Sequence, residues 1–185
     1  MVERVLVVGS GGAGKTTFSL ALAERTGLPV VHLDAHFWRP GWVQPSSEEW
    51  AEQVDRLAAE PRWIMDGNYG GTMDRRLAAC DTVVLLDPPR LLCVWRVVKR
   101  RLKHHGATRP DLAPGCPERL TMEFIRWIWS YPQRKRPTIL EKLARLRPDQ
   151  RAIVVRSQAD IEAFLAWAGA DGTSAPSPPF TPIVP

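Results

Sequence analysis

The chain of 185 residues is poor in cysteine and histidine and has no long hydrophobic run. Its three cysteines, Cys80, Cys93 and Cys116, form no C-x-x-C pair and leave an odd number, and its four histidines have no matching cysteine spacing. This argues against a disulfide framework and against a structural metal site. No apolar stretch approaches the roughly 20 residues that span a bilayer, and the first apolar run is too short for a secretory signal. We therefore expect reduced thiols, no membrane segment and a cytoplasmic protein.

Acidic residues are scarce in one part of the chain. The net charge is +5 overall, but between residues 90 and 147 there are 15 Lys or Arg residues against 4 Asp or Glu residues. Such a block is typical of a surface that docks phosphate, belonging either to a nucleotide or to nucleic acid. A solvated helical face is the alternative interpretation for any single residue in this basic block.

Short apolar runs alternate with helical patterns along the chain. Strands are expected at residues 4–8, 29–33, 62–66, 82–86 and 152–155. Helices are expected at about 14–26, from 46 onward, from 90 to about 102, and at 118–130, 132–146 and 157–167. Ser46, with Glu49 three residues later, forms a capping box at the start of the second helix. Apolar strands separated by helices predict an α/β fold with a parallel sheet covered on both faces.

The sequence GSGGAGKT, at residues 9–16, lies between the first expected strand and the first expected helix. It matches G-x-x-x-x-G-K-[ST] at Gly9, Gly14, Lys15 and Thr16, in the context that this motif requires. Small residues let backbone N–H groups surround a phosphate, and the helix N-terminus adds positive partial charge. We expect Lys15 to reach the β- and γ-phosphates of ATP and the Thr16 hydroxyl to ligate Mg²⁺. The expected nucleotide-binding residues of the loop are Gly9, Ser10, Gly11, Gly12, Ala13, Gly14, Lys15, Thr16 and Thr17.

Four further stretches resemble a known family. They are VVHLDAHFWRPGW, WIMDGNYGGTMDRRL, DTVVLLDPPRLLCVWRVVKRR and GCPERLTMEFIRWIWSYPQRKRP. Together they are similar to the bacterial adenylate-kinase-related proteins called topology modulation proteins, over about residues 3–167, and more widely to adenylate, shikimate and gluconate kinases. The resemblance implies a P-loop NTPase three-layer α/β/α sandwich, like that of nucleoside monophosphate kinases. Its five-stranded parallel sheet would have the order 2-3-1-4-5.

The expected organisation is one kinase-like domain followed by a tail. The domain spans residues 1–168 and contains a helical lid inserted after the fourth strand, at about residues 103–136. The remaining residues, 169–185, are rich in proline and are expected to be disordered.

The chain departs from true adenylate kinases at two places. Its P-loop ends in Lys-Thr-Thr rather than Lys-Gly-Thr, and DGNYG stands where those enzymes have the signature DG-F-P-R. Asp66 and Gly67 are kept, but the arginine that would grip AMP is missing. This argues against a nucleoside monophosphate as the acceptor.

Aspartates follow three expected strands, at the sheet edge where ligands of parallel sheets bind. In the implied strand order Asp66 lies beside the P-loop strand, where it is expected to hold Mg²⁺ through a water close to the substrate. A structural role in a turn is the alternative. Asp34, two strand spacings or roughly 10 Å from the P-loop strand, is expected to orient or deprotonate the acceptor; the alternative is a solvated turn residue. Asp87 is the second choice for the metal carboxylate.

Arginines and tryptophans complete the candidate site. Arg96 and Arg100 are four residues apart and share a helix face. By resemblance, Arg96 stacks on adenine and Arg100 reaches the phosphates, where it offsets the charge that builds during transfer. Arg39 is a candidate clamp for an anionic acceptor. Trp38 and Trp42 are expected either to stack on a substrate ring or to form a hydrophobic lid.

Further candidates lie downstream. By resemblance, the backbone of Arg156 and Ser157 contacts the adenine edge. The arginines that are candidates to close over the phosphates are Arg109, Arg134 and Arg136.

Three functions are compatible with these residues. The favoured one is an ATP- and Mg²⁺-dependent phosphotransferase acting on a small-molecule acceptor, a nucleotide or a hydroxylated metabolite, with Lys15, Asp34 and Arg100 as catalytic residues. The second is a nucleic-acid-binding regulator that uses ATP as a switch. The third is an NTPase with a protein partner docked on the proline-rich tail. Against the second, the tryptophans of the basic block are expected in the core, and no nucleic-acid-reading motif is evident.

Overall fold

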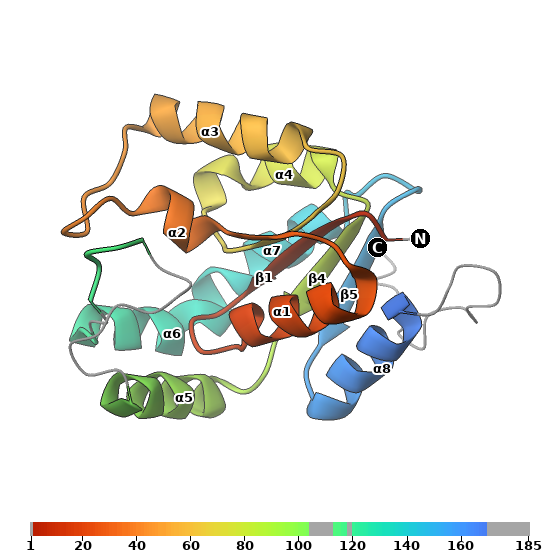
Figure 1. Ribbon diagram of the computed structural model, residues 1–185. Helices are drawn as coiled ribbons and strands as arrows, with labels where there is room; N and C mark the ends of the chain where they lie inside the picture. Colours follow the sequence, from red (N-terminus) through yellow and green to blue (C-terminus); the bar gives the residue numbers. More distant parts are fainter. Residues whose placement is uncertain (1, 104–112, 118–119, 170–185) are drawn as a thin grey trace.

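A computed structural model describes residues 2–103, 113–117 and 120–169 of the chain, and Figure 1 shows a twisted sheet between layers of helices. The strands are β1 (Arg4–Gly9), β2 (Val30–His32), β3 (Trp63–Asp66), β4 (Thr82–Leu86) and β5 (Arg151–Val155). All four pairings are parallel, and the order is β2-β3-β1-β4-β5. The strand order that the resemblance implied is therefore confirmed.

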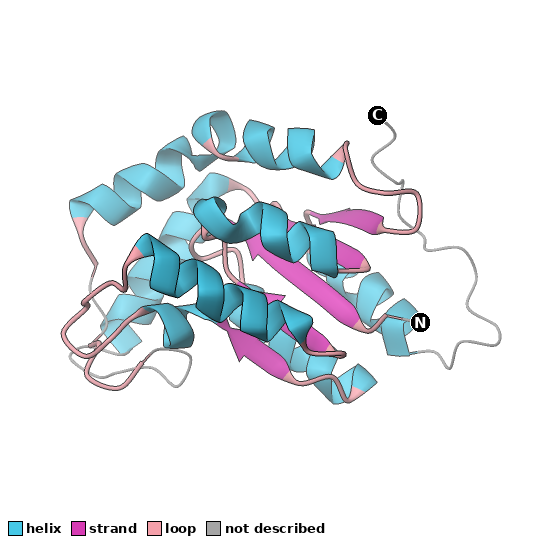
Figure 2. Ribbon diagram, turned by 90° about the horizontal axis from the view of Figure 1, so that it is seen from above, coloured by secondary structure: helices cyan, strands magenta, loops and turns pink. Residues whose placement is uncertain are grey.

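Helices follow the strands and cover the sheet, as Figure 2 shows from above. They are α1 (Lys15–Thr26), α2 (Leu33–Phe37), α3 (Ser47–Ala59), α4 (Met73–Ala79), α5 (Arg90–Lys103), α6 (Met122–Arg134), α7 (Arg136–Leu143) and α8 (Gln158–Gly169). A single 3₁₀ turn, η1 (Gly70–Thr72), precedes α4.

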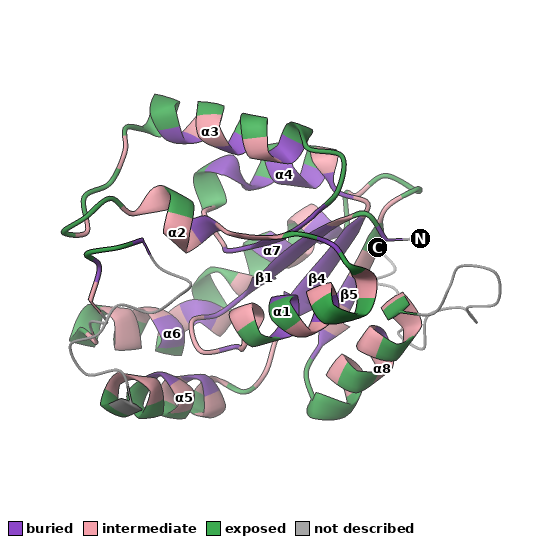
Figure 3. Cartoon of the chain, viewed as in Figure 1, coloured by how far each residue is buried: buried purple, intermediate pink, exposed green. Residues whose placement is uncertain are grey.

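Alternate residues of the central strand belong to two cores. Val5 and Val7 pack in the core that includes residues of α1, α5 and α8, whereas Leu6 and Val8 pack with residues of α3, α4 and α7. All four side chains are buried, as the colouring of β1 in Figure 3 shows. The continuous apolar sequence of this strand thus reflects a sheet buried on both faces.

The second strand is shorter than predicted. The sequence predicted a strand at residues 29–33 that ends at Asp34, but β2 stops at His32 and Asp34 lies in the first turn of α2. Leu33 and Phe37 are four residues apart, so they share one face of α2 and pack in the same core cluster. This apolar pair explains why a short helix forms here.

The helices after the basic helix begin later than predicted. α6 begins after Thr121, whose side-chain oxygen accepts a hydrogen bond of 3.1 Å from the backbone N–H of Phe124, and it runs through Pro132 to Arg134. The proline that starts a helix is Pro137, in the first turn of α7, where a backbone N–H is not needed. No element was predicted between β3 and β4, where the structure has η1 and α4.

Two predictions about side chains have opposite outcomes. The capping box is confirmed, because Ser46 Oγ accepts from the Glu49 N–H and the Glu49 carboxylate accepts from the Ser46 N–H. The tryptophans of the basic block are only partly in the core. Trp127 packs against the core, but Trp95 is 57% and Trp129 45% exposed, so the predicted core position is wrong for these two. Each instead lies beneath a cationic side chain at the surface.

Several predictions fall outside the described residues, among them Arg109, most of the predicted lid loop and the tail from residue 170. The three cysteines are buried and unpaired. Within residues 2–103, 113–117 and 120–169, no helix is both long and apolar enough to cross a membrane. The same residues contain no group of three or more His, Cys, Asp or Glu that would form a metal cage.

Candidate active site

The loop after β1 has a backbone that requires glycine. Gly9 and Gly12 have positive φ angles of 151° and 76°. A Cβ atom on Gly9 would lie 2.4 Å from the backbone oxygen of Leu86, and one on Gly12 would lie 2.3 Å from that of Cys93. Because the end of β4 and the start of α5 press against the loop, no larger residue fits at either position.

Helix α1 begins at Lys15, directly after this loop. The N–H groups of its first turn have no acceptor within the helix and, with the helix dipole, favour an anion. The Lys15 ammonium donates to the backbone oxygens of Gly9 and Ser10 at 3.0 and 3.1 Å, so it lies over the loop. Burial lowers the pKa of Lys15, while the carboxylates of Asp34 and Asp66 oppose this shift. The loop, the first helical turn and Lys15 fit a polyphosphate.

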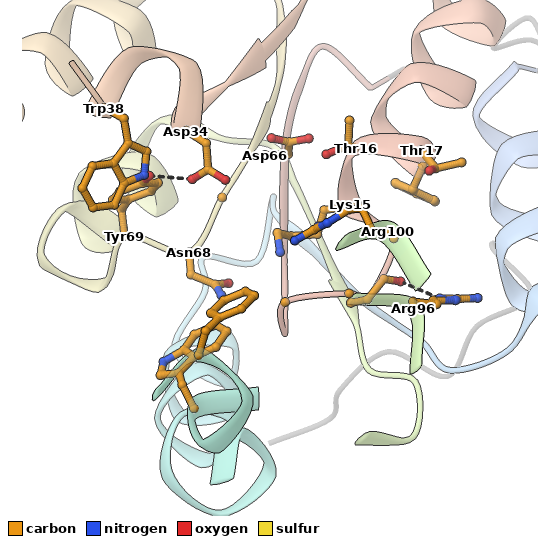
Figure 4. Close-up of a pocket in the computed structure, with 18 of the residues that line it drawn as sticks. Lys15, Thr16, Thr17, Asp34, Trp38, Asp66, Asn68, Tyr69, Arg96 and Arg100 are labelled. Carbon is orange, nitrogen blue, oxygen red and sulfur yellow. Dashed lines mark hydrogen bonds between the residues drawn. The ribbon is translucent and has the colours of Figure 1, made fainter. Parts of the chain in front are cut away.

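The loop forms one wall of a cavity of about 1160 Å³. Many of the residues that the sequence singled out line it, namely Gly11, Gly12, Ala13, Gly14, Lys15, Thr16, Thr17, Asp34, Trp38, Trp42, Asp66, Arg96 and Arg100. In Figure 4, Lys15 and Asp66 lie between two groups of side chains. We call one the arginine end, with Thr17, Arg96 and Arg100, and the other the aromatic end, with Asp34, Trp38, Asn68 and Tyr69 and with Trp42, which packs on Trp38. The cavity lining also includes Gln44, two residues after Trp42, and Gln158 and Ile161 of α8.

The arginine end is formed by α5 beside the P-loop. Arg96 and Arg100 both line the cavity, as their helical spacing predicts, and Arg96 Nη1 donates to the backbone oxygen of Ala13 at 3.2 Å. The cavity is also lined by Gln158 and Ile161 of α8, which the sequence did not single out. The predicted pair at residues 156 and 157 precedes α8 and does not line the cavity.

Asp87, the second choice for a metal carboxylate, is engaged by arginines. Arg136 Nε donates to its Oδ2 atom at 2.8 Å, and Arg156 Nε lies 3.5 Å from the same oxygen. Neither Asp87 nor Arg136 lines the cavity, and Arg134 lines a shallow hollow on the outer side of α6. In this structure Asp87 joins α7 and the segment before α8 to the end of β4.

Asp66 lies beside the P-loop strand and contacts a histidine. It is the register partner of Val7 on β1 and of His32 on β2. Its Oδ2 atom lies 2.9 Å from Nδ1 of His32, and the Asp66 side chain is only 8% exposed. Sequence reasoning missed His32 because this contact depends on the strand register. A carboxylate at residue 66 and the hydroxyl of Thr16 are hard oxygen donors, which fit Mg²⁺.

Asp34, at the aromatic end, accepts a hydrogen bond from a tyrosine. The Tyr69 hydroxyl donates to its Oδ1 atom at 2.5 Å, drawn as a dashed line in Figure 4. Burial and the Asp34 carboxylate raise the pKa of Tyr69, so the phenol keeps its proton and donates. Tyr69 also joins an aromatic cluster whose ring centroids lie 4.6 to 5.1 Å apart. Its members are Phe37, Trp38, Trp42, Trp50 and Tyr69.

A buried arginine shapes the loop that carries Tyr69. The Arg76 guanidinium donates to the backbone oxygens of Gly67, Asn68 and Tyr69 at 2.8, 2.6 and 2.9 Å. Burial lowers the pKa of Arg76 to about 10, so it stays charged at neutral pH. Asn68 in turn donates to the oxygen and accepts from the N–H of Gly9, at 2.8 and 3.0 Å. The loop after β3 is therefore tied directly to the P-loop.

Sequence reasoning singled out neither Arg76 nor Asn68. Arg76 lies in a helix that was not predicted. A single arginine in a helix is also expected to be exposed, because arginine is rarely fully buried. The pairing of Asn68 with Gly9 depends on the adjacency of β1 and β3, which only the strand order supplies.

Arg39, the candidate anion clamp, lies outside the cavity. Its side chain is 55% exposed and donates to the Glu49 carboxylate at 3.0 Å. The neighbouring backbone contacts a described part of the segment that was predicted to form a lid, since the Gly41 N–H donates to the oxygen of Gly115 at 3.1 Å. The structure thus directs this arginine toward α3 instead of toward Asp34.

No protein-family model matches the chain, and no curated protein matches it. Solved structures do resemble it. A shikimate kinase from Acinetobacter baumannii in complex with shikimate is 16% identical, with 85% of each chain covered and a TM-score of 0.52. The chain has the P-loop kinase fold.

Two further solved structures are less similar in shape. A gluconokinase from Sinorhizobium meliloti 1021 is 17% identical, covering 91% of this chain and 90% of its own, with a TM-score of 0.49. An unliganded sugar kinase from Janibacter sp. HTCC2649 is 20% identical, covering 90% and 94%, with a TM-score of 0.46. The finer resemblance to topology modulation proteins stays a prediction.

Proposed function

We propose that this protein transfers the γ-phosphoryl group of ATP to a hydroxyl group of a small molecule. One observation carries the proposal: a single cavity is lined by the P-loop lysine, Lys15, by two arginines of α5 and by the carboxylates of Asp34 and Asp66. A P-loop alone would also serve a switch or a motor. A carboxylate farther along the same cavity adds a group that can take a proton from an acceptor hydroxyl.

In this proposal the nucleotide occupies the arginine end. Backbone N–H groups of the P-loop and Lys15 bind the β- and γ-phosphates, Arg100 contacts the phosphates and Arg96 stacks on the base. Thr16 and, through a water, Asp66 would hold Mg²⁺, which offsets the charge of the phosphate oxygens when bound.

The transfer itself needs one proton acceptor and several fixed positive charges. The acceptor oxygen forms a bond to the γ-phosphorus as the bond from that phosphorus to the bridging oxygen breaks, and ADP leaves. The acceptor proton passes to the Asp34 carboxylate and then to solvent. Lys15 and Arg100 stabilise the charge that spreads over the transferring group. The Tyr69 hydroxyl holds the Asp34 carboxylate in position for this proton transfer.

The test is ADP release from Mg²⁺ and ATP, measured with and without a panel of hydroxylated acceptors. We expect an acceptor to stimulate release, and Asp34→Asn to lower the stimulated kcat by about 10² to 10⁴-fold, the range for a general base. ATP affinity, measured by calorimetry, should stay within about twofold because Asp34 lies at the aromatic end. Glu48→Gln, at an exposed residue of α3 outside the cavity, is the matched control. A protein that binds no ATP, or an Asp34→Asn variant with full stimulated activity, would contradict the proposal.

A further inference from the structure

The charged groups that face the aromatic end are acidic. Among the described residues that line the cavity, the cationic ones are Lys15, Arg96 and Arg100. The Lys15 ammonium lies on the oxygens of the P-loop, and Arg100 lies beside it in Figure 4. Arg96, farther from Asp34, donates to the backbone oxygen of Ala13. No described cationic side chain thus belongs to the aromatic end itself.

Two further arginines near the aromatic end form their hydrogen bonds or ion pairs with other groups. Arg39 is exposed and pairs with Glu49. Arg76 is fully buried, and its guanidinium donates to backbone oxygens. Among the described residues, a phosphate or carboxylate group at the aromatic end would therefore meet the carboxylate of Asp34 with no cationic side chain of that end beside it.

The remaining lining is aromatic or a neutral amide. The rings of Trp38 and Trp42 lie edge to face, with centroids 5.1 Å apart and an interplanar angle of 69°. The face of an indole ring carries negative potential, so it attracts C–H groups and cations and disfavours anions. Gln44 adds a neutral amide that donates and accepts hydrogen bonds.

The backbone holds these rings in uncommon conformations. Trp42 and Tyr69, with φ angles of 68° and 32°, are the non-glycine residues of the described chain that have positive φ. Bulky residues rarely adopt this region, and such strain concentrates at ligand-binding positions. Surrounding hydrogen bonds maintain it, including the Arg76 bond to Tyr69 and the 2.9 Å bond from the Arg39 N–H to the Val43 oxygen. Both strained residues line the aromatic end.

We propose that the acceptor is a hydroxylated molecule without a phosphate or carboxylate group, neutral or cationic, with a flat apolar face that packs against Trp38 and Trp42. This inference rests on the proposed phosphotransferase function and specifies its substrate class. A hydroxyl group of this molecule lies at Asp34, and its remaining polar groups hydrogen-bond to neutral amides such as Gln44.

The first experiment compares acceptors that differ in charge. The probes are adenosine against AMP, and glucose and glucosamine against gluconate. ADP release gives kcat/KM for each, and calorimetry with a non-hydrolysable ATP analogue and Mg²⁺ gives binding. We expect at least one neutral or cationic probe to bind and to exceed its anionic counterpart by about tenfold or more in kcat/KM. An anionic probe that equals or exceeds its counterpart overturns the inference, and so does the failure of every neutral and cationic probe to bind.

The second experiment reverses the selectivity. Gln44 is exposed, so Gln44→Arg is expected to fold and to add a cation to the lining. We expect this variant to raise the kcat/KM ratio of anionic to neutral acceptors by about tenfold, whereas Gln44→Leu leaves the ratio low. An unchanged ratio in Gln44→Arg overturns the inference.

The packing role of the indoles is tested separately. Trp38→Ala should weaken binding of the neutral probe by about tenfold, because a stacked ring face is lost. Trp129→Ala, at a tryptophan outside the cavity, should have no effect on it. If Trp38→Ala and Trp129→Ala change the affinity for the neutral probe equally, the acceptor does not stack on Trp38. A wild-type protein that binds no ATP contradicts the proposed function, whereas one that binds ATP and prefers anionic acceptors contradicts this inference alone.

Discussion

The two ends of the cavity are kept in shape by different means. The shape of the P-loop, beside the arginine end, depends on the backbone. Consecutive small residues form the turn between β1 and α1, and neighbouring backbone atoms leave no room for a Cβ on Gly9 or Gly12. The shape of the aromatic end depends instead on contacts between side chains. Tyr69 holds Asp34, Arg76 holds the backbone of the loop that carries Tyr69, and the rings pack on one another.

This difference decides which end can be recognised from sequence. The requirements of the P-loop fall on neighbouring residues, so their spacing alone indicates phosphate binding. Those of the aromatic end fall on α2, the loop after it, the loop after β3 and α4, which only the fold brings together. In this chain the phosphate-binding loop is therefore recognisable from a contiguous motif, whereas the aromatic end depends on residues far apart in the sequence.

We expect the largest effect at the P-loop. Lys15→Ala removes the ammonium that lies over the loop oxygens and should lower kcat by about 10² to 10³-fold, the size expected for a preorganised charge in phosphoryl transfer. Lys142→Ala, at a lysine paired with Asp74 on α4, is the control for a lost lysine. ADP release and ATP calorimetry measure both variants. If Lys15→Ala retained full activity and affinity, the P-loop would not be the phosphate site.

A second prediction separates steric room from backbone conformation in the loop. Gly12→Ala places a Cβ 2.3 Å from the Cys93 oxygen at a φ of 76°, whereas the Cβ of Gly27→Ala, at a φ of 67°, meets no atom of the described residues within 4 Å. Both should lose about 1 to 2 kcal/mol in free energy of unfolding from the strained φ alone. Gly12→Ala should lose more and also weaken ATP binding by at least about tenfold. Thermal unfolding and calorimetry measure this difference; equal losses in both variants would mean that the close approach of α5 does not restrict the loop.

Much of the fold was predictable because its signals are local. Apolar runs located all five strands, and the capping box located the start of α3. The short helix α2 and the helix α4 were missed, since few apolar residues define each of them and tertiary packing decides. The same reasoning missed Arg76 and Asn68, whose functions are backbone contacts to loops that only the fold brings near.

The aromatic end should respond to the loss of one hydrogen bond. Tyr69→Phe keeps the ring in its cluster and removes only the donor to Asp34. A hydrogen bond to a charged group is worth about 1.5 kcal/mol or more, so we expect acceptor-stimulated kcat to fall by about tenfold while KM for ATP is unchanged. Tyr131→Phe is the matched control, because that buried hydroxyl has no hydrogen-bond partner among the residues that the structure describes. If Tyr69→Phe behaved like Tyr131→Phe, Tyr69 would not position Asp34.

The smallest effect is expected at Arg39, although its position five residues after Asp34 predicted an anion clamp. Its side chain is 55% exposed and pairs with the equally exposed Glu49, and such surface pairs contribute about 1 kcal/mol or less. Arg39→Ala should therefore change kcat/KM for any acceptor by less than about twofold. Arg100→Ala, at an arginine that does line the cavity, should lower it by about 10²-fold or more. Acceptor titrations of both variants make the comparison. A loss in Arg39→Ala that appeared only with anionic acceptors would mean that this arginine turns inward when substrate binds, and the aromatic end would then carry the positive charge that its described lining lacks.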